Sequence, residues 1–360
     1  MTPKFPSPYV PKAALALALA CASCEPPKTP SSAPTEVSPS GVSGTSAGPG
    51  APISPSGPAA VDGTRGSTPT VGTAAPKGAK RAKMSIDEAR RYMLVLINQD
   101  RASENLPPVE LDEGAPTRSG QRHATDMAKN AFLGHWGSDG SVPEQRLTEA
   151  GGHDMVLENA SCYTDEVART IDPRPRIDPE DVERAESMFF HETPPNDGHR
   201  KNILKATHKR VGIGIAQPVA TATEIPVPCI AQEFVDPYGT YGLLPKKAKV
   251  GDVIRVEGSV EAPAEFGGVG LARVETPKPV PVAELNRRRS YPVPTPYQMY
   301  WPQGFKTPIP VAVRAGRFSV EVPVSDAGKA GLYEVSVWAK FPPSKEYVMV
   351  GLRTLPVDPK

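Results

Sequence analysis

One long stretch that cannot form a core limits where this chain can fold. Residues 25–83 consist mainly of Pro, Ser, Gly, Thr and Ala, as in "SGVSGTSAGPGAPISPSGPAA", with no apolar periodicity. Such a composition buries too little apolar surface to offset the entropy lost on ordering, so we expect a disordered linker. The fold must then lie in residues 84–360, which leave room for about two domains.

The first 24 residues have the features of an export signal. Lys4 and Lys12 precede the apolar run "AALALALACASC", which is shorter than the ~20 residues needed to span a bilayer. "LALAC" resembles the lipobox of bacterial lipoproteins and predicts a lipid on Cys21, although Ala18 stands where that motif usually has Leu. The alternative is an ordinary cleaved signal. We therefore expect an exported protein of the cell envelope or surface, with a membrane as partner through the anchor.

The cysteines and the net charge indicate which compartment and which kinds of partner to expect. Export implies an oxidising compartment, in which Cys162 and Cys229 are a candidate disulfide; two buried thiols are the alternative. The net charge of +1 gives no reason to expect a nucleic-acid partner.

Residues 84–245 mix helical and strand patterns. Ser85 and Glu88 have capping-box spacing ahead of a helical apolar pattern. Further helices are predicted for about Thr117–Asn130, from Ser141 with Glu144 again in box spacing, and from Asp178. The runs "RVGIGIA" and "PVPCIAQEFV" predict strands. Together they predict an α+β domain or a three-layer sandwich.

In residues 246–360 the apolar residues recur at every second position. "DVIRVEGSV", "RFSVEVPV" and "GLYEVSVWAKF" alternate apolar and polar residues, which predicts a small all-β, immunoglobulin-like sandwich. Between these runs lies the aromatic loop "SYPVPTPYQMYWPQGF". We expect its rings mainly to cover one end of the sandwich core; stacking on a sugar or a partner is the alternative.

Histidines and glutamates supply the candidate chemistry. All six histidines lie between residues 123 and 208. His153 follows a glycine, and so do His135 and His199. The last two, with Glu158 and Glu192, could hold a divalent metal, or share protons as acid and base. Spacing alone does not bring them together. Of the other histidines, we expect His123 to be structural or exposed, His191 to point outward and His208 to be solvated.

Five motifs in order identify a family resemblance. They are "LINQDRASENLPPVELD", "HATDMAKNAFLGH", "RLTEAGGHDMVLENAS", "GHRKNILKATHKRVGIG" and "CIAQEFVD". Over Ile86–Val235 the chain resembles the CAP superfamily, also called SCP-like, which includes cysteine-rich secretory proteins, venom antigens and plant pathogenesis-related proteins. The resemblance implies the α/β/α fold.

The same resemblance implies a site. The family has a cavity lined by two histidines and two acids, which binds a divalent ion, often zinc, in several members. These positions map to His135, Glu158, Glu192 and His199. Glu192 follows Phe189 by three, where the family usually has a tryptophan, and Leu157 replaces a usual glycine. The resemblance also brings the segments of the two candidate disulfide cysteines close together.

Three classes of function stay open. The resemblance favours a binding module, with a metal in the cavity and a lipid, glycan or protein as ligand, over an enzyme. The alternative is a metal- or histidine-dependent hydrolase of peptidase type; a third is a structural envelope protein. Against a serine hydrolase, the one Gly-x-Ser-x-Gly match, Gly44–Gly48, falls in the predicted linker.

Overall fold

The computed structural model describes residues 81–224 and 226–360. The predicted export signal, Cys21 and almost all of the predicted linker lie outside these residues. Within the described ranges, no helix is both long enough and apolar enough to cross a bilayer.

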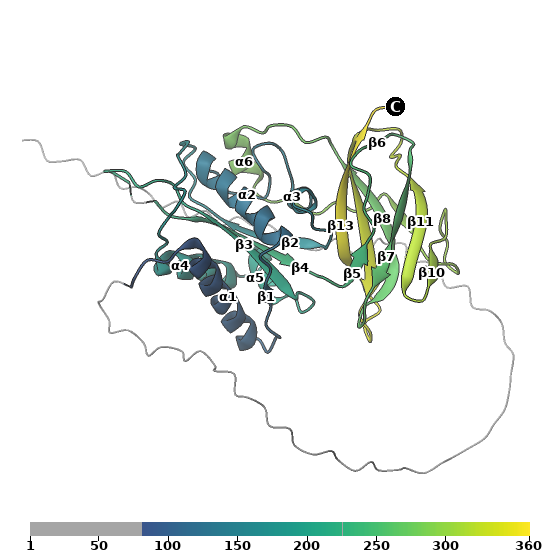
Figure 1. Cartoon of the computed structure of the whole chain (residues 1–360), viewed down its shortest axis with the longest axis horizontal. Coiled ribbons are helices and arrows are strands. Elements are labelled where there is room, and N and C mark those ends of the chain that lie inside the picture. The colour runs from purple at the N-terminus through teal and green to yellow at the C-terminus, as the bar shows by residue number, and fades with distance from the viewer. Residues whose placement is uncertain (1–80, 225) are drawn as a thin grey trace, which may run out of the picture.

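The first domain is a four-stranded mixed sheet between two helical layers (Figure 1). The strands, in spatial order, are β1 (Glu110–Leu111), β3 (Arg210–Ala216), β4 (Cys229–Val235) and β2 (Val156–Ser161). One layer contains α2 (Ala115–Asn130) and α3 (Pro143–Glu149). The other contains α1 (Ile86–Ser103), α4 (Pro179–Phe190) and α5 (Gly198–Leu204). The predicted three-layer α+β fold is confirmed.

Local capping explains where the helices begin. Ser85 and Glu88 form the predicted capping box of α1, and the Asp178 side chain caps α4. The box predicted for α3 is wrong, because Val142 is the N-cap residue and makes no side-chain bond. Glu144 instead points toward the second domain, where it meets Tyr291.

The second domain is an all-β sandwich, as predicted. One sheet has the order β10 (Ala312–Arg314), β11 (Arg317–Pro323), β7 (Val253–Val260) and β5 (Gly239–Tyr241). The other has the order β6 (Ala248–Lys249), β13 (Tyr347–Asp358), β12 (Gly331–Lys340), β8 (Glu265–Val274) and β9 (Gln298–Tyr300). The alternating Phe318, Val320 and Val322 of β11 all enter the core between the sheets. The strand β5 precedes the expected domain boundary at Lys246.

The two domains share a continuous interface. The segment before β2 runs antiparallel to β13: Met155 N–H donates to the Val350 carbonyl at 3.1 Å, and Leu352 N–H to the His153 carbonyl at 3.2 Å. Beside this pairing lies an apolar cluster with members from both domains. Its buried members are Met155, Leu157, Met299, Trp301, Trp338, Met349 and Leu352.

A second connection leaves the sandwich and returns to the first domain. We call residues 275–297, between β8 and β9, the strap; it contains α6 (Val282–Arg288), which lies over α2 in Figure 1. Leu285 joins the apolar cluster of α2, and the Asn286 side chain accepts the Leu133 N–H at 3.0 Å. The aromatic loop is used here too: Tyr291 and Trp301 are buried against the first domain.

Two buried carboxyl groups meet at the interface. The Tyr291 hydroxyl lies between Glu144 of α3 and Glu334 of β12, 3.2 Å from the latter, and both glutamates are 1% exposed. Burial raises the pKa of both carboxyl groups, and the charge of Glu144 raises that of Glu334 further. Arg146 acts in the opposite direction on Glu144. A single tyrosine proton cannot serve both carboxylates, so the cluster favours a protonated carboxyl group.

This pair predicts a stability that falls with rising pH. The unfolded carboxyl groups titrate near 4.5 and the folded ones higher, so the native state holds more protons between those values. Glu334→Gln is expected to flatten this dependence and to be more stable than wild type by about 1–3 kcal/mol at pH 8. Urea unfolding at pH 5, 6, 7 and 8 measures the free energy of unfolding of both proteins. Parallel curves for the two proteins would contradict the role of the pair.

Candidate functional site

Four segments of the first domain bring the predicted residues together. His135 lies in the loop after α2, Glu158 on β2, Glu192 just after α4 and His199 in the first turn of α5. Their exposed fractions are 1%, 2%, 9% and 7%, so the four side chains are almost enclosed. The His135 N–H donates to the Arg289 carbonyl of the strap at 3.0 Å, so the second domain helps to hold this loop.

The four side chains form two histidine–glutamate pairs. His135 Nδ1 lies 2.9 Å from Glu158 Oε1, and His199 Nδ1 lies 2.7 Å from Glu192 Oε1. Glu192 also accepts the His199 backbone N–H at 2.9 Å. The two imidazole ring centroids are 6.3 Å apart. The ring of His199 packs edge-on against Phe189, with the two ring centroids 4.7 Å apart. Phe189 is the residue in the place of the family's tryptophan.

Arg146 compensates the charge of Glu158. Its Nη2 donates to Glu158 Oε2 at 2.8 Å and to the His135 carbonyl at 3.1 Å, and the guanidinium is 1% exposed. Burial alone would raise the pKa of Glu158, but Arg146, followed by the nearby histidines, holds it well below its ordinary range. Glu158 is therefore an anion that accepts the Nδ1–H of His135.

These contacts decide how a metal could be held. Because each Nδ1 faces a carboxylate, Nε2 is the ring nitrogen through which His135 and His199 could bind an ion. Carboxylates behind ligating histidines are a common arrangement in zinc sites. Among the residues that the structure describes, no group of three or more His, Cys, Asp or Glu side chains is arranged to hold a metal. The donor set fits two histidine ligands, with Glu158 and Glu192 orienting them rather than binding directly.

Further buried acidic side chains lie near the histidine–glutamate pairs, and the sequence motifs did not predict them. Burial raises the pKa of Glu186 on α4 to about 8, and burial together with Glu158 raises that of Glu233 on β4. In the sequence, Gln232 and Glu233 are polar residues within the otherwise apolar strand "CIAQEFV". This interruption is the pattern that could have indicated polar groups in the core. Gln232 bonds to Glu186 and, at 2.9 Å, to Asn159, so these polar groups connect α4 to β2 through the core.

The remaining histidines differ in their surroundings. His191 is exposed, as predicted. His123 is fully buried and structural, with Nε2 2.7 Å from the Gly134 carbonyl. The expectation for His208 is wrong: it is 2% exposed, stacks on Phe234, and its Nδ1 lies 2.7 Å from Asp236. The residues next to His208 in the sequence are polar, and its partner Asp236 lies much further along the chain. The local sequence therefore did not indicate that His208 is buried.

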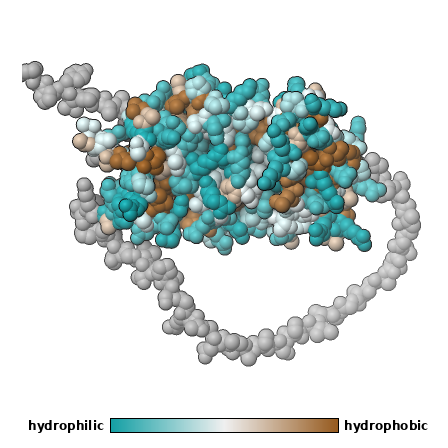
Figure 2. All heavy atoms as spheres, turned by 45° about the horizontal axis from the view of Figure 1, so that its top comes forward, coloured by the Kyte–Doolittle hydropathy of each residue, from teal (hydrophilic) through white to brown (hydrophobic). Residues whose placement is uncertain are grey.

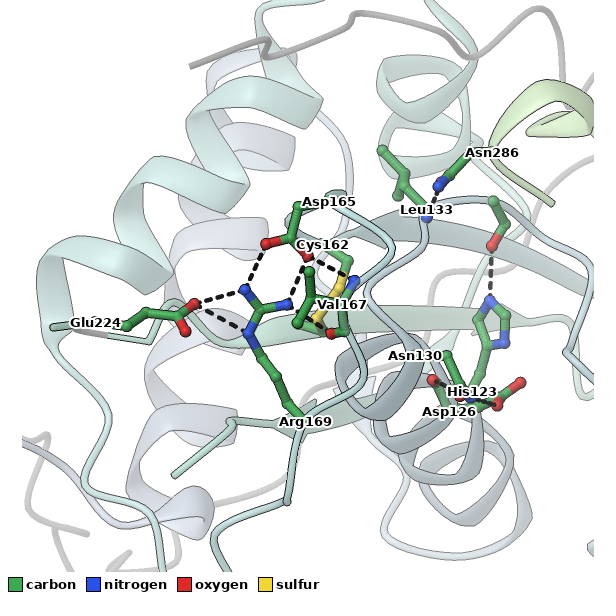
Figure 3. The surroundings of a disulfide bond; sticks show 12 residues. His123, Asp126, Asn130, Leu133, Cys162, Asp165, Val167, Arg169, Glu224 and Asn286 are labelled. Atoms are coloured by element: carbon green, nitrogen blue, oxygen red, sulfur yellow. Dashed lines mark hydrogen bonds and ion pairs between the residues drawn. A yellow bond between two sulfur atoms is a disulfide. The ribbon is translucent and has the colours of Figure 1, made fainter. Parts of the chain in front are cut away.

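The predicted disulfide is present. Cys162, after β2, is bonded to Cys229 at the start of β4, across a sequence separation of 67. Beside the disulfide, Arg169 forms ion pairs with Asp165 at 2.6 Å and with Glu224 at 2.7 Å (Figure 3). These ion pairs connect the loop that follows β2 to the loop between β3 and β4. A disulfide of this kind points to an oxidising environment.

Comparison with known proteins identifies the family of part of the first domain. The family model of the cysteine-rich secretory protein family, CAP, matches residues 94–219, a range that includes both histidine–glutamate pairs. No curated protein matches the chain. The chain therefore contains a CAP domain, of the cysteine-rich secretory protein family, followed by an all-β sandwich.

Proposed function

We propose that this protein is an exported binding module of the cell envelope, with a divalent metal site formed by His135 and His199. The observation that carries the proposal is the pair of neighbouring imidazoles, each held by a buried glutamate within a CAP domain. Zinc suits two imidazole ligands with other positions open. The disulfide supports an extracytoplasmic location, and the lipobox-like "LALAC" supports a lipid anchor on Cys21.

A binding role fits the surroundings better than catalysis. The four side chains are 1–9% exposed, which leaves little room for a substrate as bulky as a polypeptide at the histidines. Figure 2 shows a mainly hydrophilic face on which the hydrophobic residues form separate patches. On this face, polar ligands or a protein partner are favoured over a broad apolar contact.

Zinc titration tests the proposal. The purified protein is expected to bind about one zinc ion, because the pairs present two oriented imidazoles. Glu192→Gln is expected to weaken binding about 10–100-fold, since a neutral amide supports the ligand less well. His135→Ala/His199→Ala is expected to abolish it. Isothermal titration calorimetry at neutral pH measures all three.

The matched control is His191→Ala. This histidine is exposed and adjoins Glu192, so its removal tests whether any nearby imidazole suffices. Zinc affinity should stay at the wild-type value. Equal zinc affinity in wild type and in the double histidine variant, or no binding by wild type, would contradict the proposal.

A further inference from the structure

The two imidazoles of the candidate site come from opposite helical layers of the first domain. Strand β2 lies at the edge of the sheet, and successive residues of a strand point to opposite faces. Glu158 faces the layer of α2 and α3, where it meets His135 and Arg146. His199 belongs to α5, in the other layer. The distance between the two imidazoles therefore depends on how β2 is attached to α5.

Two buried asparagines form this attachment. Asn159 follows Glu158 on β2 and points to the α5 side of the sheet, where its Nδ2 donates to the His199 carbonyl at 3.2 Å. Asn202 lies three residues after His199 on α5. Its Nδ2 donates to the Glu158 carbonyl at 3.3 Å and to Asn159 Oδ1 at 2.9 Å. Asn159 and Asn202 are 0% and 1% exposed. Each asparagine therefore bonds to the backbone of the site residue on the opposite element.

The acceptors fix the orientation of both side-chain amides. Backbone carbonyls only accept, so each asparagine must present Nδ2 to them. Asn159 Nδ2 also donates to Gln232 Oε1 of β4 at 2.9 Å, and Gln232 in turn donates to Glu186 of α4. The chain of amides thus extends to the helix that precedes Glu192. Buried polar networks of this kind rigidify the groups that they join.

We propose that Asn159 and Asn202 are positioning residues for the two-histidine metal site. They set the separation of the His135 and His199 imidazoles, whose ring centroids lie 6.3 Å apart. This role presupposes that the site binds zinc, as proposed for the protein. Ligands of one ion must be held within about 0.5 Å of the productive geometry. The two glutamates orient each ring separately, whereas the asparagines join the two sides of the site.

Zinc titration of the full chain by calorimetry tests this role. Asn202→Ala removes the donor to the Glu158 carbonyl, and it is expected to weaken zinc binding about 10-fold or more. Asn159→Ala removes the donor to the His199 carbonyl from the other side, and the same loss is expected. The two variants act on different elements, so one serves where the other does not fold.

The matched control is Asn98→Ala. The Asn98 side chain, on α1, donates to the Val109 carbonyl at 2.9 Å and accepts the Val109 N–H at 2.8 Å. Val109 precedes β1, at the opposite edge of the sheet from β2. The control therefore also removes asparagine–backbone bonds from this domain. Urea unfolding is expected to show a lower free energy of unfolding for all three variants, but zinc affinity should stay at the wild-type value in Asn98→Ala.

Crystal structures of the metal-free proteins give a second readout that does not require zinc. The distance between the two imidazole centroids is expected to change in Asn202→Ala and to keep its wild-type value in Asn98→Ala. An unchanged distance in Asn202→Ala, or an undiminished zinc affinity, overturns the positioning role. Absence of zinc binding by wild type instead contradicts the metal site, and the distance then still decides whether the asparagines set the spacing of the rings.

Discussion

A fragment that ends at Pro245 is expected to lose cooperative folding. The first domain would expose Met155 and Leu157, which are 1% and 3% exposed in the intact protein. It would also lose the backbone pairing to β13 and the strap contact that holds the His135 loop. Each large apolar side chain contributes about 1.5–3 kcal/mol on burial. The combined loss approaches the about 5–15 kcal/mol that stabilises a typical domain.

Thermal unfolding followed by circular dichroism measures this, with dye binding to exposed apolar surface as a second readout. We expect a broad transition and strong dye binding for residues 81–245. The matched control is the intact protein cut at an introduced protease site at Leu243, which is 98% exposed. The cut protein keeps both partners and should melt as one unit. A cooperative transition of the fragment near that of the intact protein would show that the domains are independent.

Replacement of Arg146 is expected to have the largest effect of any single substitution at the site. Arg146→Ala leaves the Glu158 carboxylate buried without its cation, which typically costs about 3–5 kcal/mol. The variant should regain stability as pH falls, because Glu158 then has a raised pKa and becomes neutral on protonation. In wild type the lowered pKa of Glu158 gives the opposite sign: its contribution is present near neutral pH and is lost in acid.

Urea unfolding at pH 5 and pH 7.5 measures the loss, and Arg122→Ala is the control. Arg122 also binds two carboxylates, Asp139 and Glu149, but its side chain is 41% exposed. Its loss should cost less than about 1 kcal/mol, since water replaces the cation. If Arg146→Ala costs no more than Arg122→Ala, the buried charge network is not what stabilises the site.

The sequence predicted the parts of the fold that local patterns determine. The capping box of Ser85 and the alternation of Phe318, Val320 and Val322 depend on neighbours a few residues away, and both are confirmed. Motif order, rather than spacing, supplied the histidine–glutamate positions. The structure then shows the orientation that motifs do not contain, with each carboxylate facing an Nδ1.

Long-range polar contacts escaped prediction for a physical reason. Glu144 has the spacing of a capping residue, but its partner Tyr291 lies in the strap, 147 residues away. His208 has a polar local sequence, yet Asp236 and Phe234 bury it. The free energy of these contacts depends on which elements pack together, and a single sequence does not show that.

Zinc K-edge X-ray absorption of the zinc-loaded protein tests the central claim most directly. We predict a shell with two imidazole nitrogens at about 2.0–2.1 Å and oxygen ligands in the remaining positions, which disappears in His135→Ala/His199→Ala. A shell without imidazole, or one unchanged in that double variant, would contradict the assignment of His135 and His199 as the metal site of this CAP domain.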